Sequence, residues 1–170
     1  MAENKTNTQQ LVVFSLSSEE YGVPITQIQE IIRLPEITRV PGASGFIEGV
    51  INLRGRIIPI IDLRGRFGLG RKERTEKNRI VVADAVGQTV GLVVDGVSEV
   101  LQVSGEQIDP IPPSLASVDS EYLSGVAKVG KLLVILLNLG KIFNDPEKAE
   151  LADAAGAGVS GDKEEEKIKR

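Results

Sequence analysis

The sequence carries one residue pattern twice. Residues 11–32 align without a gap with residues 80–101 at an offset of 69 positions, and their apolar positions coincide. Within this stretch Glu30 aligns with Glu99. A repeat of this length is sought before local structure is assigned, because it predicts two similar structural units rather than one irregular domain.

The similarity continues downstream at a drifting offset. It is 71 positions for residues 37–41 and 76 positions for Gly49 and Val50. Residues 55–58 then parallel residues 130–133, which places Gly55 on Gly130. The drift indicates short insertions in loops between conserved elements of the two copies.

Each copy is predicted to consist of short β-strands. Apolar runs alternate with Gly, Pro, Ser and Asp, a pattern typical of small barrels and sandwiches. The chain is 41% hydrophobic but only 4% aromatic, and its Val and Ile favour strands. Hairpin turns are expected at residues 18–19 and 87–88, where Gly87 can adopt a positive φ. We predict strands near residues 10–16, 20–24, 38–41, 46–53 and 56–61, and near residues 79–85, 89–95, 109–111, 125–129 and 132–137.

Two helices interrupt this all-β pattern. Ile25, Ile28, Ile31 and Ile32 recur at helical spacing before Pro35, which predicts one short helix. Packing of that apolar stripe in the core is one interpretation, and docking of a partner is the other. After Phe143, residues 145–155 resemble a capped C-terminal helix with Asp145 as the N-cap and Pro146 in the first turn.

The two ends of the chain are expected to be flexible. Residues 1–9 are polar, and residues 156–170 combine glycine and serine with a run of charges that buries almost nothing. No apolar segment fits a signal peptide or a membrane span, so a cytoplasmic location is expected.

The residue types present exclude most catalytic schemes. The chain has no cysteine and no histidine, so it lacks thiolate chemistry, disulfides and the usual general base near neutral pH. Asp62, Asp84 and Asp95 each follow an apolar run, and a pair of them could perform acid–base chemistry if the fold joined them. The simpler interpretation is that each caps a turn. We therefore expect no enzyme, no cofactor and no metal.

A basic segment keeps nucleic acid as the alternative ligand. Residues 54–79 hold nine Lys and Arg residues against three acidic ones. Against nucleic acid, Phe67 is the segment's single aromatic residue and the whole chain has a net charge of −4. A nearly neutral body with strand edges favours protein–protein recognition.

Three segments resemble the characteristic motifs of the CheW family of chemotaxis coupling proteins. Residues 46–69 (FIEGVINLRGRIIPIIDLRGRFGL) resemble its signature, and residues 21–32 and 90–101 match its other segments. The resemblance covers residues 10–144. It implies two small SH3-like five-stranded barrels from an internal duplication, with units near residues 10–78 and 79–144 that could be intertwined.

The resemblance also implies an adaptor that couples chemoreceptors (methyl-accepting chemotaxis proteins) to the histidine kinase CheA and helps to control the kinase. The expected partners are the receptor's cytoplasmic hairpin tip and the regulatory domain of CheA. Protein contacts would then recruit the adaptor to membrane receptor arrays without membrane insertion. The matching receptor-binding residues are Glu30, Gly49, Asn52 and Arg54, and the matching kinase-binding residues are Val12, Ile25 and Ile28.

Some of these assignments compete with structural roles. Glu30 and Arg54 could form an ion pair at the rim of the receptor surface. Gly49 could instead serve a bulge, and Arg54 and Gly55 could simply form a turn between strands. Ile28 could touch either partner.

Overall fold

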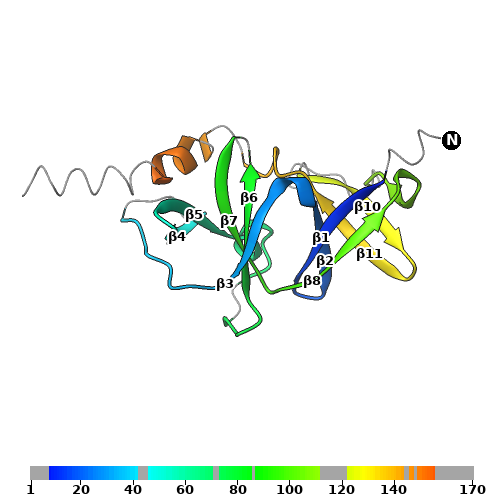
Figure 1. Ribbon diagram of the computed structural model, residues 1–170, viewed down its shortest axis with the longest axis horizontal. Coiled ribbons are helices and arrows are strands. Elements are labelled where there is room, and N and C mark those ends of the chain that lie inside the picture. Colours follow the sequence, from blue (N-terminus) through cyan, green and yellow to red (C-terminus); the bar gives the residue numbers. More distant parts are fainter. Residues whose placement is uncertain are drawn as a thin grey trace, which may run out of the picture.

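Two β-sheets lie side by side in the computed structural model (Figure 1). The structure describes residues 8–41, 46–70, 73–85, 87–111, 122–143, 146–147 and 149–155. The first sheet has six strands in the order β8 (Gly96–Val103), β1 (Gln9–Leu16), β2 (Glu19–Pro24), β11 (Leu132–Leu137), β10 (Leu123–Val129) and β9 (Ile108–Asp109). The second sheet has five strands in the order β3 (Ile28–Arg33), β6 (Arg79–Ala85), β7 (Gln88–Val94), β5 (Arg56–Asp62) and β4 (Ile47–Leu53).

The helical elements are short. The described part of the chain includes the 3-10 turns η1 (Ile25–Gln27) and η2 (Gly105–Gln107), and the one-turn helix α2 (Leu63–Arg66). Residues 146–147 and 149–155 are helical near the C-terminus. The prediction of an all-β fold with a few short helices is confirmed.

The two copies of the repeat exchange strands. β1 and β2 from the first copy pair with β8 and β11 from the second copy, whereas β6 and β7 from the second copy pair with β3 and β5 from the first. Among the described strands, the chain passes between the sheets twice, from β2 to β3 through η1 and from β7 to β8 through Asp95. Each sheet therefore needs both halves of the sequence.

The exchange of strands is reciprocal, and single residue pairs in one sheet have equivalents in the other. In the first sheet Asp109 pairs with Val126, and in the second sheet Thr38 forms an isolated bridge with Val50. These pairs correspond through the sequence offsets of 71 and 76. The expected strand at residues 38–41 is thus reduced to one bridge, and the expected strand at residues 109–111 lies at Ile108–Asp109.

The predicted helix near residues 25–32 is wrong. After the single turn of η1, β3 forms an edge strand that pairs with β6, and its residues alternate between half-buried and exposed. The spacing of Ile28 and Ile32 fits a helix and a strand alike, because residues four positions apart share a face in both. This pattern therefore could not distinguish the two elements. Its counterpart in the second copy, β8, was likewise not predicted as a strand.

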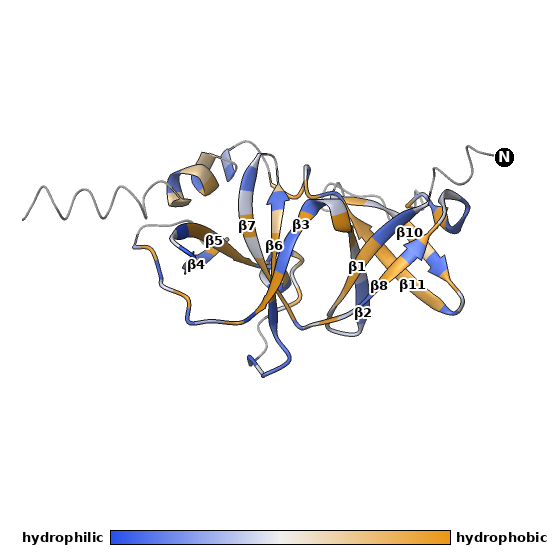
Figure 2. Cartoon of the chain, in the orientation of Figure 1, coloured by the Kyte–Doolittle hydropathy of each residue, from blue (hydrophilic) through white to orange (hydrophobic). Residues whose placement is uncertain are grey.

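Apolar side chains form three buried clusters, which we call the central, first and second cores. Figure 2 shows hydrophobic residues along the strands of both sheets. The first core belongs to the first sheet and includes Leu11 and Val134, and the second core belongs to the second sheet and includes Ile60 and Ile80. The central core draws on both sheets and is the largest, and its fully buried members include Phe14, Leu16, Val23, Leu63, Val81, Leu92, Val94 and Leu139.

Aromatic rings extend through the central core. Phe14 stacks on Tyr21 at a centroid distance of 6.0 Å, Tyr21 packs against Phe67 at 5.4 Å, and Phe67 stacks on Tyr122 at 4.9 Å. Desolvation by burial, with smaller effects from Glu19 and Tyr122, raises the pKa of Tyr21. These contacts join β1 and β2 to the segment that follows α2.

The C-terminal helical residues cover this core from one side, above β4 and β5 in Figure 1. Leu151 is fully buried in the central core. Arg66 of α2 forms a bidentate ion pair with Glu147, with N–O distances of 2.5 and 2.6 Å. Asp145, the predicted N-cap, and residues 1–7 and 156–170 lie outside the described residues.

No helix among the described residues has the length and apolar character needed to span a membrane.

Substitution of Gly49 by alanine is expected to lower the free energy of unfolding by about 1–3 kcal/mol through overpacking. A Cβ atom at this position would lie 2.7 Å from Ile37 Cγ2 and closer still to the backbone oxygen of Thr38. Urea unfolding followed by circular dichroism measures the change.

Gly65→Ala is the matched control, because a Cβ there meets nothing within 4 Å and alanine favours the helix. If Gly49→Ala unfolds at the same urea concentration as the wild type, the close approach of Thr38 is not a constraint on this position.

Candidate functional site

The four residues predicted to bind a receptor all lie in the second sheet. Glu30 is on β3, Gly49 and Asn52 are on β4, and Arg54 is in the turn between β4 and β5. The Arg54 guanidinium donates to the Glu30 carboxylate, which confirms the predicted ion pair. Because β3 and β4 are the opposite edges of this sheet, the ion pair connects one edge with the turn at the other.

Arg54 adopts a backbone conformation that disfavours side chains. Its φ is 53°, in the left-handed region, whereas most other positive-φ residues are glycines. The strand pairs Leu53–Arg56 and Val129–Leu132 show that the corresponding residue of the second copy is Gly130, with a φ of 62°. The sequence alignment of Gly55 on Gly130 was one residue out of register, because it matched glycine to glycine.

Backbone strain of this kind persists where the surrounding structure imposes it, and it concentrates at functional sites. The Asn52 side-chain oxygen accepts a hydrogen bond from the Gly55 backbone N–H at 2.8 Å and so supports the turn. The Arg54 side chain remains 69% exposed. The turn therefore presents a guanidinium where the second copy has a bare glycine.

Gly49 has a structural explanation. It lies at a register shift between β4 and β5, and Gly125 lies at the equivalent shift between β10 and β11. A Cβ at Gly125 would lie 2.8 Å from the Asp109 backbone oxygen, which matches the close approach of Thr38 to Gly49. Since both copies need glycine here, packing alone accounts for Gly49, and a receptor contact remains a prediction.

A polar network beside the ion pair was not predicted from the sequence. Gln29 Nε2 donates to Asp84 Oδ1 at 2.6 Å and to Thr89 Oγ1 at 3.1 Å. Arg56 Nη2 also donates to Thr89 Oγ1, at 2.8 Å. The network joins β3, β5, β6 and β7 on the surface, and only the outward alternation of polar residues in these strands could have indicated it.

The three residues predicted to bind the kinase differ in accessibility. Val12 is 2% exposed and Ile25 is 37% exposed. Ile28 is half-buried and packs against the central core. Of the three, Ile25 is the side chain best placed to meet a partner directly.

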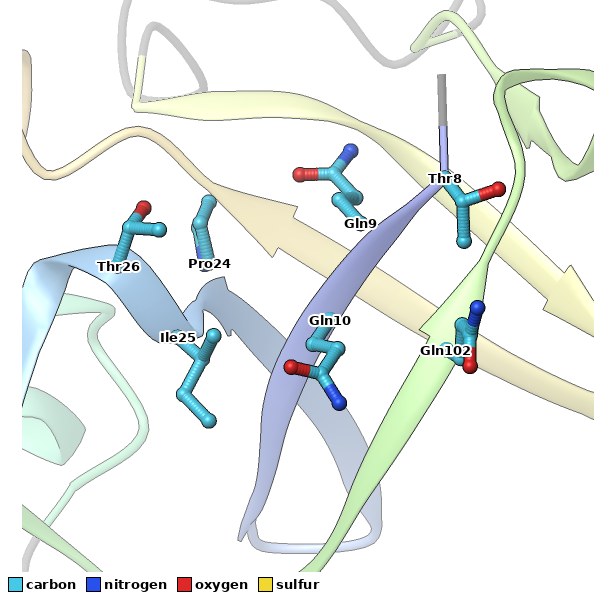
Figure 3. Close-up of a pocket in the computed structure, with 7 residues that line it drawn as sticks. All are labelled: Thr8, Gln9, Gln10, Pro24, Ile25, Thr26 and Gln102. Carbon is cyan, nitrogen blue, oxygen red and sulfur yellow. The ribbon is translucent and has the colours of Figure 1, made fainter. Parts of the chain in front are cut away.

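A shallow hollow of about 380 Å³ lies beside Ile25. Figure 3 shows the residues that line it, which come from the starts of β1 and η1 and from the end of β8. All are uncharged: Thr8, Gln9, Gln10, Pro24, Ile25, Thr26 and Gln102. The hollow offers amide and hydroxyl groups next to an exposed isoleucine.

Three arginines of the basic segment form ion pairs within the described part of the chain. Arg64 pairs with Asp95 at 2.8 Å, Arg66 pairs with Glu147, and Arg74 pairs with Glu48 and Asp62. The side-chain hydrogen bond to Glu48 raises the pKa of Arg74. Arginines that are paired in this way have little positive charge left for a polyanion, and this argues against nucleic acid.

Each strand-end aspartate accepts hydrogen bonds from helix, turn or strand residues of the chain. Asp62 caps α2 by accepting from the Arg64 backbone N–H at 2.9 Å, and Asp84 accepts from Gln29. Asp95 accepts from the Ser17 backbone N–H at 2.7 Å. Among the described residues no group of three or more Asp and Glu residues could hold a metal ion.

Comparisons with known proteins agree on one family, CheW. The family model described as "CheW-like domain" matches residues 10–147. A chemotaxis protein CheW from Klebsiella aerogenes is 38% identical over 151 residues, which are 89% of this chain and 91% of the relative. A CheW from Treponema pallidum is 33% identical over 149 residues, 85% of this chain and 87% of the relative.

The fold also matches a solved structure. The crystal structure of the scaffolding protein TtCheW from Thermoanaerobacter tengcongensis is similar with a TM-score of 0.73 and 40% identity. The match covers 80% of this chain and 88% of that protein.

The strain at Arg54 predicts that Arg54→Gly unfolds at a higher urea concentration than Arg54→Ala, with a difference of about 1 kcal/mol. Both substitutions remove the exposed ion pair, which itself contributes about 0.2–1 kcal/mol. The difference in free energy of unfolding between the two variants therefore reports the backbone strain at residue 54. Equal stability of the two variants would mean that the left-handed conformation is not strained at this turn.

Proposed function

Because the chain belongs to the CheW family, we propose that it is a chemotaxis adaptor that couples chemoreceptors to the histidine kinase CheA and helps to control the kinase. The observation that carries the receptor half of this proposal is Arg54. An arginine is held in a strained turn, is paired with Glu30, and stays largely exposed at a position where the second copy has glycine.

The receptor surface in this proposal consists of Glu30, Gly49, Asn52 and Arg54, and it meets the tip of the receptor's cytoplasmic hairpin. Arg54 and Glu30 offer charges of both signs, which favours a polar partner with complementary charges. Asn52 holds the turn, and Gly49 holds the strand against Thr38. The last two residues act on the receptor through the shape of the surface.

The kinase surface consists of Val12, Ile25 and Ile28 and meets the regulatory domain of CheA. Ile25 is the anchor, because its side chain is the exposed one of the three. The uncharged hollow beside it can accept a protruding apolar side chain and bond the backbone next to it. Val12 and Ile28 support the anchor from within.

The mechanism is geometric and needs no covalent step. Two surfaces on one chain raise the effective concentration of receptor and kinase for each other. Interfaces of standard size bury about 800 Å² per partner, which is compatible with micromolar or tighter binding. The kinase conformation that fits the receptor-bound geometry is then favoured, which is a shift in population. We propose that the protein has no catalytic activity. We also propose that it is cytoplasmic and is recruited to receptor arrays by these contacts alone.

The test is a binding experiment on purified full-length chain with a receptor cytoplasmic fragment and with CheA. Arg54→Gly is expected to lose receptor binding by about 1.4 kcal/mol or more, a factor of about ten, and to keep kinase binding. Ile25→Asp is expected to do the reverse. Isothermal titration measures both affinities.

Two further variants control for nonspecific effects. Leu133→Asp places the same charge as Ile25→Asp at an apolar residue that is 58% exposed, and it should leave both kinase binding and receptor binding intact. A charge swap, Glu30→Arg with Arg54→Glu, rebuilds the ion pair in reverse. If the double variant binds the receptor as tightly as the wild type does, the ion pair acts by shaping the turn and not by direct contact. Failure of folded wild type to bind either partner would refute the proposal, and retention on heparin in place of such binding would favour nucleic acid.

A further inference from the structure

Arg64 is the centre of a partly buried cluster that joins three separate segments. Its Nη1 donates to Asp95 Oδ2 at 2.8 Å and to Ser17 Oγ at 2.9 Å. Its other nitrogens donate to the backbone oxygens of Gly70 at 3.1 Å and Leu69 at 3.3 Å. The side chains of Arg64 and Asp95 are only 12% and 8% exposed. A guanidinium can hold several acceptors in a fixed planar geometry, and this one does so.

The cluster sits where the chain changes sheets. β7 ends at Val94 in the second sheet and β8 begins at Gly96 in the first, so Asp95 is the single residue between them. Asp95 also binds the first sheet twice: its carboxylate accepts from Ser17 N–H in the β1–β2 turn, and its own N–H donates to the Ser15 oxygen of β1 at 3.0 Å. Arg64, in α2 directly after β5, therefore ties the second sheet to a crossover and a turn of the first.

Ser17 is held in an unusual conformation by these contacts. Its φ is 56°, and it is one of two non-glycine residues with a positive φ in the described chain. The surrounding structure has to impose such a conformation, because it costs about 1–3 kcal/mol. The other such residue is Arg54, at the receptor surface.

The other crossover, from β2 to β3 through η1, lacks this cluster. Asp62 and Asn138 cap their turns in the same way, Asp62 by accepting from Arg64 N–H and Asn138 by accepting from Gly140 N–H, each at 2.9 Å. Arg64 therefore corresponds to Gly140 in the second copy, and Asp95 corresponds to Thr26, in η1 of the first copy. Within the described chain, the buried Gln27 Oε1 at this second crossover has no hydrogen-bond partner. The two crossovers are thus unequal.

We propose that Arg64 is a positioning residue that fixes the angle between the two sheets at the β7–β8 crossover. The proposed receptor surface lies in the second sheet, whereas the proposed kinase surface spans the crossover, with Val12 in β1 of the first sheet, Ile25 in η1 and Ile28 in β3 of the second sheet. The angle between the sheets therefore sets where the first-sheet part of the kinase surface lies relative to the receptor surface, a consequence that rests on the proposed function. Loss of the cluster leaves the side chains of both surfaces in place but lets the first-sheet part of the kinase surface move relative to the receptor surface.

The first test measures the angle directly. The chain has no cysteine, so Arg33→Cys on β3 and Lys131→Cys in the β10–β11 turn, both exposed, can each carry a spin label. Pulsed electron paramagnetic resonance gives the distribution of distances between the labels. Arg64→Lys, Arg64→Met and Asp95→Asn should each broaden the distribution, by about twofold for Arg64→Met, because packed interfaces have discrete alternative arrangements.

Arg66→Met is the matched control. It removes another part-buried ion pair, but one that joins α2 to the C-terminal helical residues. Circular dichroism confirms that each variant is folded, and the milder variants Arg64→Lys and Asp95→Asn serve if Arg64→Met is not. Unchanged widths in the Arg64 and Asp95 variants, or equal broadening by Arg66→Met, would overturn the inference.

The second test measures the consequence for coupling. Kinase affinity is determined with and without the receptor fragment, for wild type and for Arg64→Lys. The wild type should bind the kinase more tightly with receptor present by about fivefold or more, and the variant should lose this gain while each separate affinity is kept. A gain equal to that of the wild type would refute the role in coupling. If the wild type binds neither partner, the proposed function fails, and the distance measurement still decides the role of Arg64 in the sheet angle.

Discussion

The central core between the two sheets is the contact on which the rest of the structure depends. Because the copies exchange strands, neither sheet is complete without residues from both halves, and the side chains of the central core belong to both sheets. Burial of one large aliphatic side chain contributes about 1.5–3 kcal/mol, whereas a whole domain is stable by about 5–15 kcal/mol. A core of this size holds the two sheets together, and the proposed role of the Arg64 cluster is to fix the angle between them.

Comparison of the two copies separates residues that the fold requires from residues that distinguish one copy. Gly22 and Gly91 face the same kind of crowding from the neighbouring strand, and Gly49 and Gly125 each admit a backbone oxygen. Asp62 and Asn138 cap equivalent turns. These pairs follow from the shared architecture. Arg54 and Arg64 have glycine as their counterpart, so the architecture alone does not require either side chain.

The sequence predicted what depends on local pattern and missed what depends on distant partners. Alternation and turn residues located most strands, and Gly87 has the expected positive φ of 77°. The ion pair of Glu30 and Arg54 was predicted from the family resemblance and is present. β3 was mistaken for a helix because its isoleucine spacing fits both periods. Nothing local marks Arg64 and Asp95 as partners, since they are 31 positions apart and meet only after the sheets pack.

The reciprocal exchange of strands has a consequence for synthesis of the chain on the ribosome. β1 and β2 are made first and can pair with each other, but their outer neighbours β8 and β11 lie near residues 100 and 135, so the first sheet cannot be completed until most of the chain is made. Pairing between such distant segments is slow, and unpaired strand edges are prone to associate with other chains. The second sheet needs residues 28–94 alone and can close earlier. Vectorial synthesis would thus assemble the second sheet, with the Arg54 turn, before the first sheet exists.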